Sequence, residues 1–559
     1  MNTLRYLLLG LIALPSALQC QPALIPFPTS YMASKDEFVV DNSVVILYGD
    51  LAAAHADYLK AWYQTNIGLT VVSKPIEEGA PAGGKFILLN CGPHVDVEEV
   101  RKAIPQAPNL KLDAAMLRSS NEDYTMGITS VSMVLNGNGP EGLFYAIQTL
   151  IQLSQFSYSG NGKTLSVACA QIQDRPAFSH RGMLLDCCRH FMPVELVMQY
   201  IDLLAFYKMN TLHWHLTDDQ GWRIQIDAYP ELTEVGAWRT EKDGSRYGGY
   251  YSKEDIRKII AYAASRYVTV VPEIEMPGHS TAAIAAYPWL SCTGHQIEVE
   301  NEWGVFKDIY CAGNDSTYVF IENVLKEVCA LFPSRLIHIG GDEAPHTRWE
   351  ACPKCKQCMK SNTLNTPLEL QAHFMERVGK ILAKFDKTMI GWDEIMDGEI
   401  PDDACVQVWR SANGGIANSG HRIVMSPTSH CYFDYPLSNI DMEKVYQFDP
   451  LNGVADDKAH LVMGGECNLW SEHIWPETLD QKVFPRALAM AEVLWTYPVN
   501  RNYAAFTQRV QAHYPLLRRM EVEYGYPTTP AKLKSQTLSE GMRISVQESI
   551  EGIHVSCQS

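Results

Sequence analysis

Two adjacent carboxylates, Asp342 and Glu343, are the clearest sign of chemistry in this chain of 559 residues. Neighbouring residues of a regular strand point to opposite faces of a sheet, so both side chains can share a site only where the strand has ended. Gly340 and Gly341 precede the pair and allow that change of direction. A pair of acids with different proton affinities is the usual equipment for cleaving a glycosidic bond. The alternative is a helix N-cap followed by an acid in the first turn.

Polar and aromatic residues also occur directly after seven other short apolar runs. The candidates are Arg189, Asp218, His279, Trp392, Trp409, Tyr432, Asp434, Trp470 and Glu472. Aromatic faces stack on the C–H face of a pyranose, and carboxylates and arginine bind its hydroxyl groups. Any one tryptophan fits equally well as core filling, and any one acid as a cap. Their recurrence after every run favours one sugar-binding site.

These residues need a scaffold that gathers the ends of many strands. Eight apolar runs occur between residues 175 and 500, at 182–186, 211–216, 268–275, 336–340, 388–391, 405–408, 422–425 and 462–469. Helical apolar spacing is found between most of them, at 193–207, 253–266, 317–331, 367–385 and 479–495. The alternation predicts an α/β fold, a closed (β/α)8 TIM barrel whose chemistry lies at the C-terminal strand ends. An open doubly wound sheet is the alternative, but no glycine-rich phosphate turn follows the first run.

The rest of the chain divides into three regions. We expect a signal peptide at 1–20, a small N-terminal α/β domain at 21–174, and a helix with a strand-like tail at 501–559. The apolar run after Arg5 is too short to span a bilayer and has the length of a signal h-region. The sequence therefore predicts an exported protein, which would be periplasmic, an outer-membrane lipoprotein or secreted.

Partners are constrained by composition and charge. The chain is 46% hydrophobic and 20% charged, which is globular composition, and its net charge of −18 argues against binding nucleic acid or anionic lipid. No later run is long and apolar enough for a transmembrane helix. Residues 17–20 resemble a loose lipoprotein box with Cys20 as the anchor, but Gln19 is a poor residue before such a cysteine. Lipidation and oligomeric state stay open.

The cysteines allow several interpretations. Cys352, Cys355 and Cys358 have the spacing of metal-chelating thiolates, but a fourth ligand at matching spacing is missing. We therefore expect an exposed loop with a disulfide or free thiols. Cys292 and Cys311 bracket a polar loop and are predicted to form a disulfide in an oxidising compartment.

Two histidines on one strand face, His213 and His215, resemble the His-x-His of metal-dependent hydrolases. His279 is alone, and His338 lies inside a strand, so no further histidines complete a metal centre. The sequence therefore favours core or helix-facing histidines over a metal centre.

Four longer motifs carry a family resemblance: Asp-Cys-Cys-Arg-His-Phe at 186–191, and the segments at 213–220, 272–279 and 338–343. Together they resemble the β-N-acetylhexosaminidases of glycoside hydrolase family twenty, over about residues 22 to 500. The resemblance implies an exo-acting, substrate-assisted retaining mechanism, in which the 2-acetamido oxygen of the sugar attacks the anomeric carbon and gives an oxazolinium intermediate. Glu343 would be the general acid and then the base, and Asp342 would orient the acetamide. The mechanism that the resemblance implies needs no metal and no organic cofactor.

The resemblance also assigns the surrounding residues. Tyr432 would hold the acetamide oxygen, and Asp218 and His279 would form a hydrogen-bonded chain behind Glu343. The walls of the acetamido pocket would be Trp392, Trp409 and Trp470. The ring hydroxyl groups would be bound by Arg189, Asp434 and Glu472. Three rival functions are release of a disaccharide, an inactive sugar-binding protein, and a metal hydrolase built on the His-x-His pair. The sequence does not choose between N-acetylglucosamine and N-acetylgalactosamine, or name the linkage.

Overall fold

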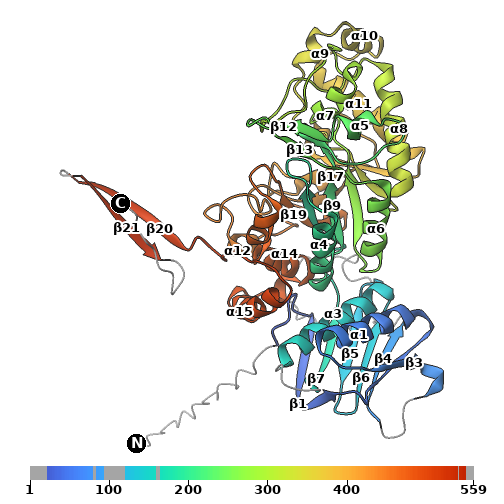
Figure 1. Cartoon of the computed structure of the whole chain (residues 1–559), viewed down its shortest axis with the longest axis vertical. Helices are drawn as coiled ribbons and strands as arrows, with labels where there is room; N and C mark the ends of the chain where they lie inside the picture. The colour runs from blue at the N-terminus through green and yellow to red at the C-terminus, as the bar shows by residue number, and fades with distance from the viewer. Residues whose placement is uncertain (1–21, 80–83, 93–119, 159–163, 539–540, 549–559) are drawn as a thin grey trace, which may run out of the picture.

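The computed structural model describes residues 22–79, 84–92, 120–158, 164–538 and 541–548. A sheet domain lies at one end of the molecule and a barrel rises above it (Figure 1). The expected signal peptide and Cys20 fall outside the described residues. Within the described ranges, no helix has both the length and the apolar character needed to cross a membrane.

The second domain is a closed eight-stranded parallel barrel, which confirms the predicted fold. Its strands are β8 (His180–Asp186), β9 (Thr211–His215), β14 (Thr269–Glu273), β15 (Leu336–His338), β16 (Thr388–Trp392), β17 (Cys405–Val408), β18 (Arg422–Met425) and β19 (Val462–Leu469). The last strand closes on the first in register, from Gly464 opposite His180 to Leu469 opposite Leu185. Strands that are buried on both faces read as continuous apolar runs, and for this reason the eight were visible in the sequence.

Helices surround the barrel unevenly. The main ones are α4 (Val194–Phe206), α6 (Lys253–Ala264), α8 (Asp315–Leu331), α11 (Pro367–Ala383), α13 (Leu479–Val483), α14 (Arg486–Trp495) and α15 (Tyr503–Arg519). The single helix predicted at 479–495 is wrong: Phe484 is extended, and Pro485 has no N–H with which to continue α13. The connections that precede β17 and β18 are the one-turn helices η4 (Asp393–Asp397) and η5 (Gly415–Ser419).

Long loops at the C-terminal ends of the strands carry small elements. They are β10 (Thr217–Asp218), β11 (Gly221–Trp222), α5 (Glu231–Glu234), β12 (Trp238–Thr240), β13 (Arg246–Gly248), α7 (Thr281–Ala286), η3 (Pro288–Leu290), α9 (Thr347–Ala351), α10 (Pro353–Ser361) and α12 (Met442–Tyr446). Most of these elements lie at the end of the barrel that is remote from the sheet domain, whereas α12 packs beside α14 (Figure 1).

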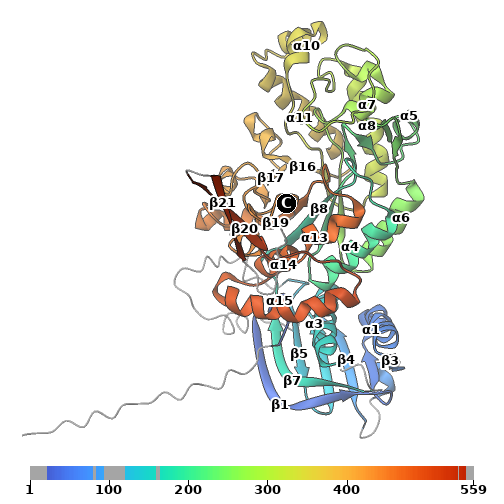
Figure 2. The same ribbon diagram turned by 60° about the vertical axis from the view of Figure 1, so that its left-hand side comes forward.

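The N-terminal domain is a mixed seven-stranded sheet in the order β1-β7-β5-β6-β4-β2-β3. Its strands are β1 (Ser30–Val40), β2 (Val45–Tyr48), β3 (Val72–Pro75), β4 (Phe86–Cys91), β5 (Tyr124–Ile128), β6 (Ser132–Gly137) and β7 (Leu165–Asp174). The helices α1 (Ala53–Asn66) and α3 (Pro140–Ser157) cover the face of the sheet toward the barrel (Figure 2). Residues 142–154 of α3 are all buried, because this helix lies between the sheet and the barrel.

Buried ion pairs join the two domains. Arg181 at the start of β8 contacts Glu122 at 2.6 Å, and Lys208 contacts Asp174 at 3.0 Å. A buried charge is tolerated only with a partner, so each pair fixes the mutual position of the domains. The sheet domain therefore supports the N-terminal ends of the barrel strands and leaves the opposite ends open.

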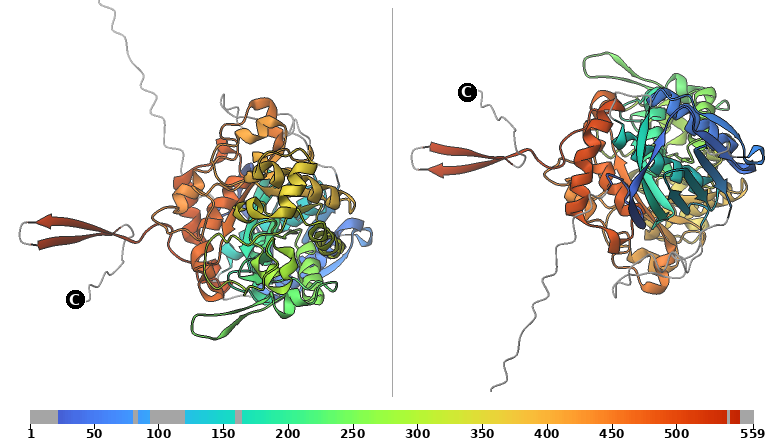
Figure 3. Two further views of the ribbon diagram at one scale, coloured as in Figure 1. Left: turned by 90° about the horizontal axis from the view of Figure 1, so that it is seen from above. Right: turned by 90° about the horizontal axis from the view of Figure 1, so that it is seen from below.

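The C-terminal region begins with α15, whose His513 donates a hydrogen bond from Nε2 to the backbone oxygen of Ala23, 2.7 Å away. Strands β20 (Ala531–Leu538) and β21 (Gly541–Glu548) then pair as an antiparallel hairpin. The hairpin extends away from both domains (Figure 3).

Candidate active site

The carboxylate pair lies immediately after β15, where the backbone turns left-handed. The φ angles are 66° at Gly340, 98° at Gly341 and 45° at Glu343. A Cβ at Gly340 would lie 1.6 Å from Oε2 of Glu275, so no other residue fits at this position. The turn brings both Asp342 and Glu343 to the lining of one cavity.

This cavity has a volume of about 180 Å³. It is lined by Arg189, His279, Asp342, Glu343, Trp392, Trp409, Tyr432, Asp434, Tyr435, Trp470 and Glu472. Every site residue predicted from the sequence is in this lining except Asp218, and Tyr435 is the addition. A larger cavity of about 1010 Å³ beside α15 has no carboxylate in its lining, so it lacks the acid pair found here.

His279 lies directly behind the carboxylate pair. Its Nε2 is 3.7 Å from Oδ2 of Asp342 and 3.6 Å from Oε2 of Glu343. Its Nδ1 is 3.1 Å from Asp219 and 3.3 Å from Asp218, which places Asp218 one step behind the cavity. Burial opposes protonation of this ring, but the charge of Asp218 raises the pKa of His279 well above its usual value. The pair therefore faces an imidazolium ion.

The two carboxylates have different proton affinities in the ligand-free site. Burial raises the pKa of Asp342 to about 6. The hydrogen bond from His279 lowers the pKa of Glu343, whose side chain is 42% exposed. Neighbouring acids whose pKa values are separated by their surroundings are suited to different roles in one reaction.

Arg189 is fixed at the edge of the cavity by several contacts. It forms an ion pair with Asp218 at 2.9 Å and donates to Gln220 at 3.1 Å. Its guanidinium carbon lies 5.1 Å from the ring centroid of Trp470. Because these contacts hold the planar group in one orientation, it can present fixed donors to a hydroxyl group.

Aromatic rings form the wall opposite the acids. Trp392 and Trp470 lie 5.8 Å apart, and Trp409 stacks on Tyr432 at 6.3 Å. Two indoles donate to carboxylates, from Trp392 to Glu273 at 2.9 Å and from Trp409 to Glu394 at 2.8 Å. These bonds set the ring planes, so the tryptophans are oriented surfaces of the cavity and not simple core filling.

Two buried oxygens of the lining, Asp342 Oδ1 and Asp434 Oδ1, have no hydrogen-bond partner among the described residues. Burial and the neighbouring charge of Glu472 raise the pKa of Asp434 to about 7. Leaving a buried acceptor unsatisfied costs free energy, which a ligand that carries N–H or O–H groups would recover.

Comparison with known proteins places this site in a family. Residues 178–498 match the model of glycosyl hydrolase family 20, catalytic domain, and residues 21–175 match that of family 20, domain 2. The chain belongs to glycosyl hydrolase family 20.

Individual relatives agree with this membership. The chain is 39% identical over 511 residues to a β-hexosaminidase of Porphyromonas gingivalis, with 87% of this chain and 62% of that protein covered. It is 36% identical to a β-hexosaminidase of Vibrio furnissii, with 66% of this chain and 64% of that protein covered. The chain thus spans less than two thirds of the length of both relatives. A crystal structure of a family 20 exo-β-N-acetylglucosaminidase from Vibrio harveyi with N-acetylglucosamine superposes with a TM-score of 0.78 at 32% identity, covering 91% of this chain and 79% of that one.

Four residues of this family 20 site were not predicted from the sequence: Asp219, Glu275, Glu394 and Tyr435. Asp219 accepts from the backbone N–H of Thr281 at 3.0 Å and bonds to His279. Burial raises the pKa of Glu394 to about 8, and burial and the charge of Asp342 raise that of Glu275 well above its usual range. Asp219 and Glu275 lie inside the motif segments 213–220 and 272–279, and Glu394 and Tyr435 lie within two residues of Trp392 and Asp434. These positions were the only signal available.

The His-x-His pair lies inside the barrel. His213 is 2.7 Å from Glu466, and His215 is 2.5 Å from Glu273 and 2.8 Å from Asp218. Burial opposes their charge, but these carboxylates raise the pKa of His213 to about 9 and that of His215 to about 10. Both rings therefore serve the interior charge network, as interior histidines were expected to do.

Two expectations about cysteines are wrong. Cys292 and Cys311 are free and not joined in a disulfide. Cys352 and Cys355 are buried and not on an exposed loop. The reason is that α10 packs onto the preceding loop, which brings Cys311 within 3.8 Å of Cys352 and 3.7 Å of Cys355.

We expect Gly340→Ala to lower the rate of hydrolysis of an aryl N-acetylglucosaminide by about 10²-fold, because a displacement of about 1 Å at a catalytic group has an effect of this size. The added Cβ collides with Glu275 and forces the turn that carries Asp342 to move. Gly68→Ala is the matched control, since Gly68 has a φ of 78° with nothing within 4 Å of its Cβ. The measurement is the steady-state kinetics of both variants. Wild-type turnover by Gly340→Ala would contradict the prediction.

Proposed function

We propose that this protein is an exo-acting β-N-acetylhexosaminidase that releases terminal β-linked N-acetylglucosamine or N-acetylgalactosamine by substrate-assisted retaining hydrolysis. The observation that carries the proposal is the arrangement of Asp342 and Glu343 at one small aromatic cavity, with Asp342 Oδ1 unpartnered. The Vibrio harveyi neighbour, an exo-β-N-acetylglucosaminidase, supports the same substrate class.

In the first step, Glu343 gives its proton to the glycosidic oxygen as the bond from that oxygen to the anomeric carbon breaks. The acetamide oxygen of the same sugar forms a new bond to the anomeric carbon, which gives the oxazolinium ion and retains the overall stereochemistry after the second step. Asp342 accepts the acetamide N–H, and its negative charge stabilises the positive charge that develops there. Tyr432, at the aromatic wall, is positioned to hold the acetamide oxygen.

In the ligand-free site the pKa of Asp342 is raised and that of Glu343 is lowered. The first step needs the opposite, a protonated Glu343 and an ionised Asp342, and we infer that substrate binding reverses the order. The sugar covers the exposed side of Glu343 and removes water from it, which raises the pKa of that acid. The acetamide N–H bonds to Asp342 and favours its charged form. The leaving group then departs, and Glu343 accepts a proton from the water that opens the oxazolinium ring.

The size of the cavity supports exo action. Its volume of about 180 Å³ is smaller than that of sites for drug-sized ligands, which begin near about 300 Å³, and it suits one sugar unit. Arg189, Asp434 and Glu472 lie at the rim, where ring hydroxyl groups of that unit would be bound. A disaccharide-releasing enzyme would need a longer cleft. The N-terminal segment supports export as the location of this activity.

The test of the proposal compares aryl β-N-acetylglucosaminide, aryl β-N-acetylgalactosaminide and plain aryl β-glucoside. Only the acetamido sugars carry the internal nucleophile, so we expect turnover of one or both of them and none of the glucoside. Equal turnover of the glucoside would show that an enzyme carboxylate is the nucleophile and would refute substrate assistance.

Glu343→Gln should lower kcat by about 10²–10⁴-fold on substrates with poor leaving groups, the usual size of a general-acid contribution. The loss should be smaller on activated aryl glycosides, because their leaving groups need less protonation. Glu350→Gln is the matched control, since Glu350 is an exposed residue of α9 in the same loop. A Glu343→Gln variant as active as the control on the poor substrates would exclude the acid role.

Asp342→Asn should abolish most hydrolysis and remove one limb of the pH profile. Because kcat/KM reports groups of the free enzyme, and the reacting form carries one proton on the pair, wild-type kcat/KM should fall as the pH rises through about 6, where the proton held mainly by Asp342 is lost. The asparagine variant should fold normally, by its thermal midpoint, and lack this limb near pH 6. An unchanged limb, or a glycosyl group covalently trapped on Asp342, would count against the mechanism.

A further inference from the structure

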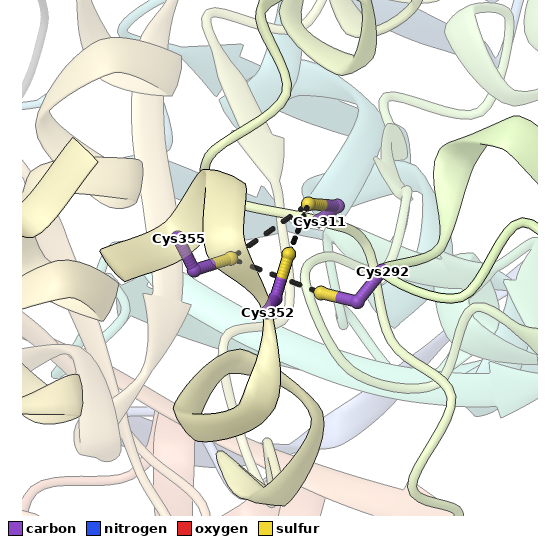
Figure 4. Close-up of side chains that lie close together, drawn as sticks. All are labelled: Cys292, Cys311, Cys352 and Cys355. Atoms are coloured by element: carbon purple, nitrogen blue, oxygen red, sulfur yellow. Dashed lines mark hydrogen bonds between the residues drawn. The ribbon is translucent and has the colours of Figure 1, made fainter. Parts of the chain in front are cut away.

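Four cysteines from two loops meet at one point outside the catalytic cavity (Figure 4). The cluster consists of Cys292, Cys311, Cys352 and Cys355, and is called here the thiol cluster. The sulfur of Cys355 lies 3.7 Å from that of Cys292 and 3.7 Å from that of Cys311. The sulfur of Cys311 lies 3.8 Å from that of Cys352, and all four sulfurs lie within 4.8 Å of one another.

These separations match those of sulfur ligands around one metal ion. Four sulfurs placed tetrahedrally at about 2.3 Å from a zinc ion lie about 3.8 Å from one another. A disulfide would bring two sulfurs to about 2.05 Å. Cys311 and Cys355 each contact two other cysteines, so the thiol cluster does not divide into two separate pairs.

The surroundings of the cluster also suit thiolate ligands. Cys352 is the N-cap of α10 and Cys355 lies in its first turn, where the helix dipole favours negative charge. Three of the four cysteines are buried, and Cys292 is half-buried.

Gly313 shows how closely the two loops pack against each other. A Cβ at this residue would lie 2.3 Å from the carbonyl carbon of Lys354 and 2.4 Å from the backbone nitrogen of Cys355. Only glycine allows this approach, and the approach is what brings Cys311 to the first turn of α10.

We propose that the thiol cluster holds one structural Zn²⁺ ion. On binding, each of the four thiols loses its proton, four Zn–S bonds form, and four protons are released. With sulfur at all four positions the ion has no open site for water or substrate, so its role is to hold the chain together.

The ion would clamp the two loops that carry the acid–base groups. Cys292 and Cys311 belong to the loop after β14, which also carries His279. Cys352 and Cys355 belong to the loop after β15, which begins with Asp342 and Glu343. Other contacts join the same segments, including the bond from Trp349 Nε1 to the backbone oxygen of Tyr310 at 2.9 Å and the ion pair of Arg348 with Asp308 at 2.9 Å. The site therefore fixes His279 relative to the carboxylate pair without touching substrate.

The test is elemental analysis and native mass spectrometry of the full chain, purified without chelator. We expect one zinc per chain, and loss of that zinc in Cys352→Ser and Cys355→Ser. Cys358→Ser is the matched control: Cys358 lies on the same helix, but its sulfur contacts Asn362 at 3.6 Å and is outside the cluster. The control should keep its zinc.

A second measurement, on the wild-type chain, tests the proposal even if the cysteine variants fail to fold. A mercurial reagent added to the wild-type chain should release one equivalent of zinc, detected with a chromogenic chelator, as the cluster thiols react. A chain without bound zinc, or one whose denatured mass is lighter by four hydrogen atoms with these cysteines found as two disulfides, would overturn the proposal. Neither readout uses glycoside hydrolysis, so the proposal stands or fails separately from the proposed function.

Discussion

The site depends on holding two adjacent negative charges beside one positive ring. Asp342 and Glu343 repel each other, and His279 lies within 4 Å of both. Its charge is in turn maintained by Asp218 and Asp219 on the opposite side of the ring. Without this alternation of charges a buried acid pair would share a proton, as like charges in close contact do. The rest of the barrel mouth serves to keep these groups in place.

The alternation continues into the barrel. Asp218 contacts His215, His215 contacts Glu273, and Glu273 also accepts from Trp392 on the cavity wall. The interior of this barrel is therefore a charged network and not only apolar packing. Because removing one partner of a buried pair leaves an uncompensated charge, substitutions within the network will affect folding and catalysis together. This rigidity lets the site keep separated proton affinities in neighbouring acids.

The sequence predicted the fold and most of the cavity lining because both leave a local signal. Strands buried on both faces are apolar runs, and a residue such as Trp392 or Asp342 that follows one must lie at the mouth of the barrel. Glu275 ends the third apolar run, but its place under Gly340 depends on how two neighbouring strands pack, which no local pattern shows. The thiol cluster was missed for the same reason, since its two halves are separated along the chain and meet only through the folding of α10 onto another loop.

The contacts that stabilise the barrel and the residues of the cavity lie at opposite ends of it, and this arrangement affects how the sequence can change during evolution. The sheet domain and the ion pairs of Arg181 and Lys208 secure one end of the barrel, whereas the long loops project from the other. Insertions, deletions and new side chains can accumulate in those loops at little risk to folding. Lineages that share this foundation are therefore free to diverge in the glycans they accept, while the positions that carry the carboxylates stay where they are.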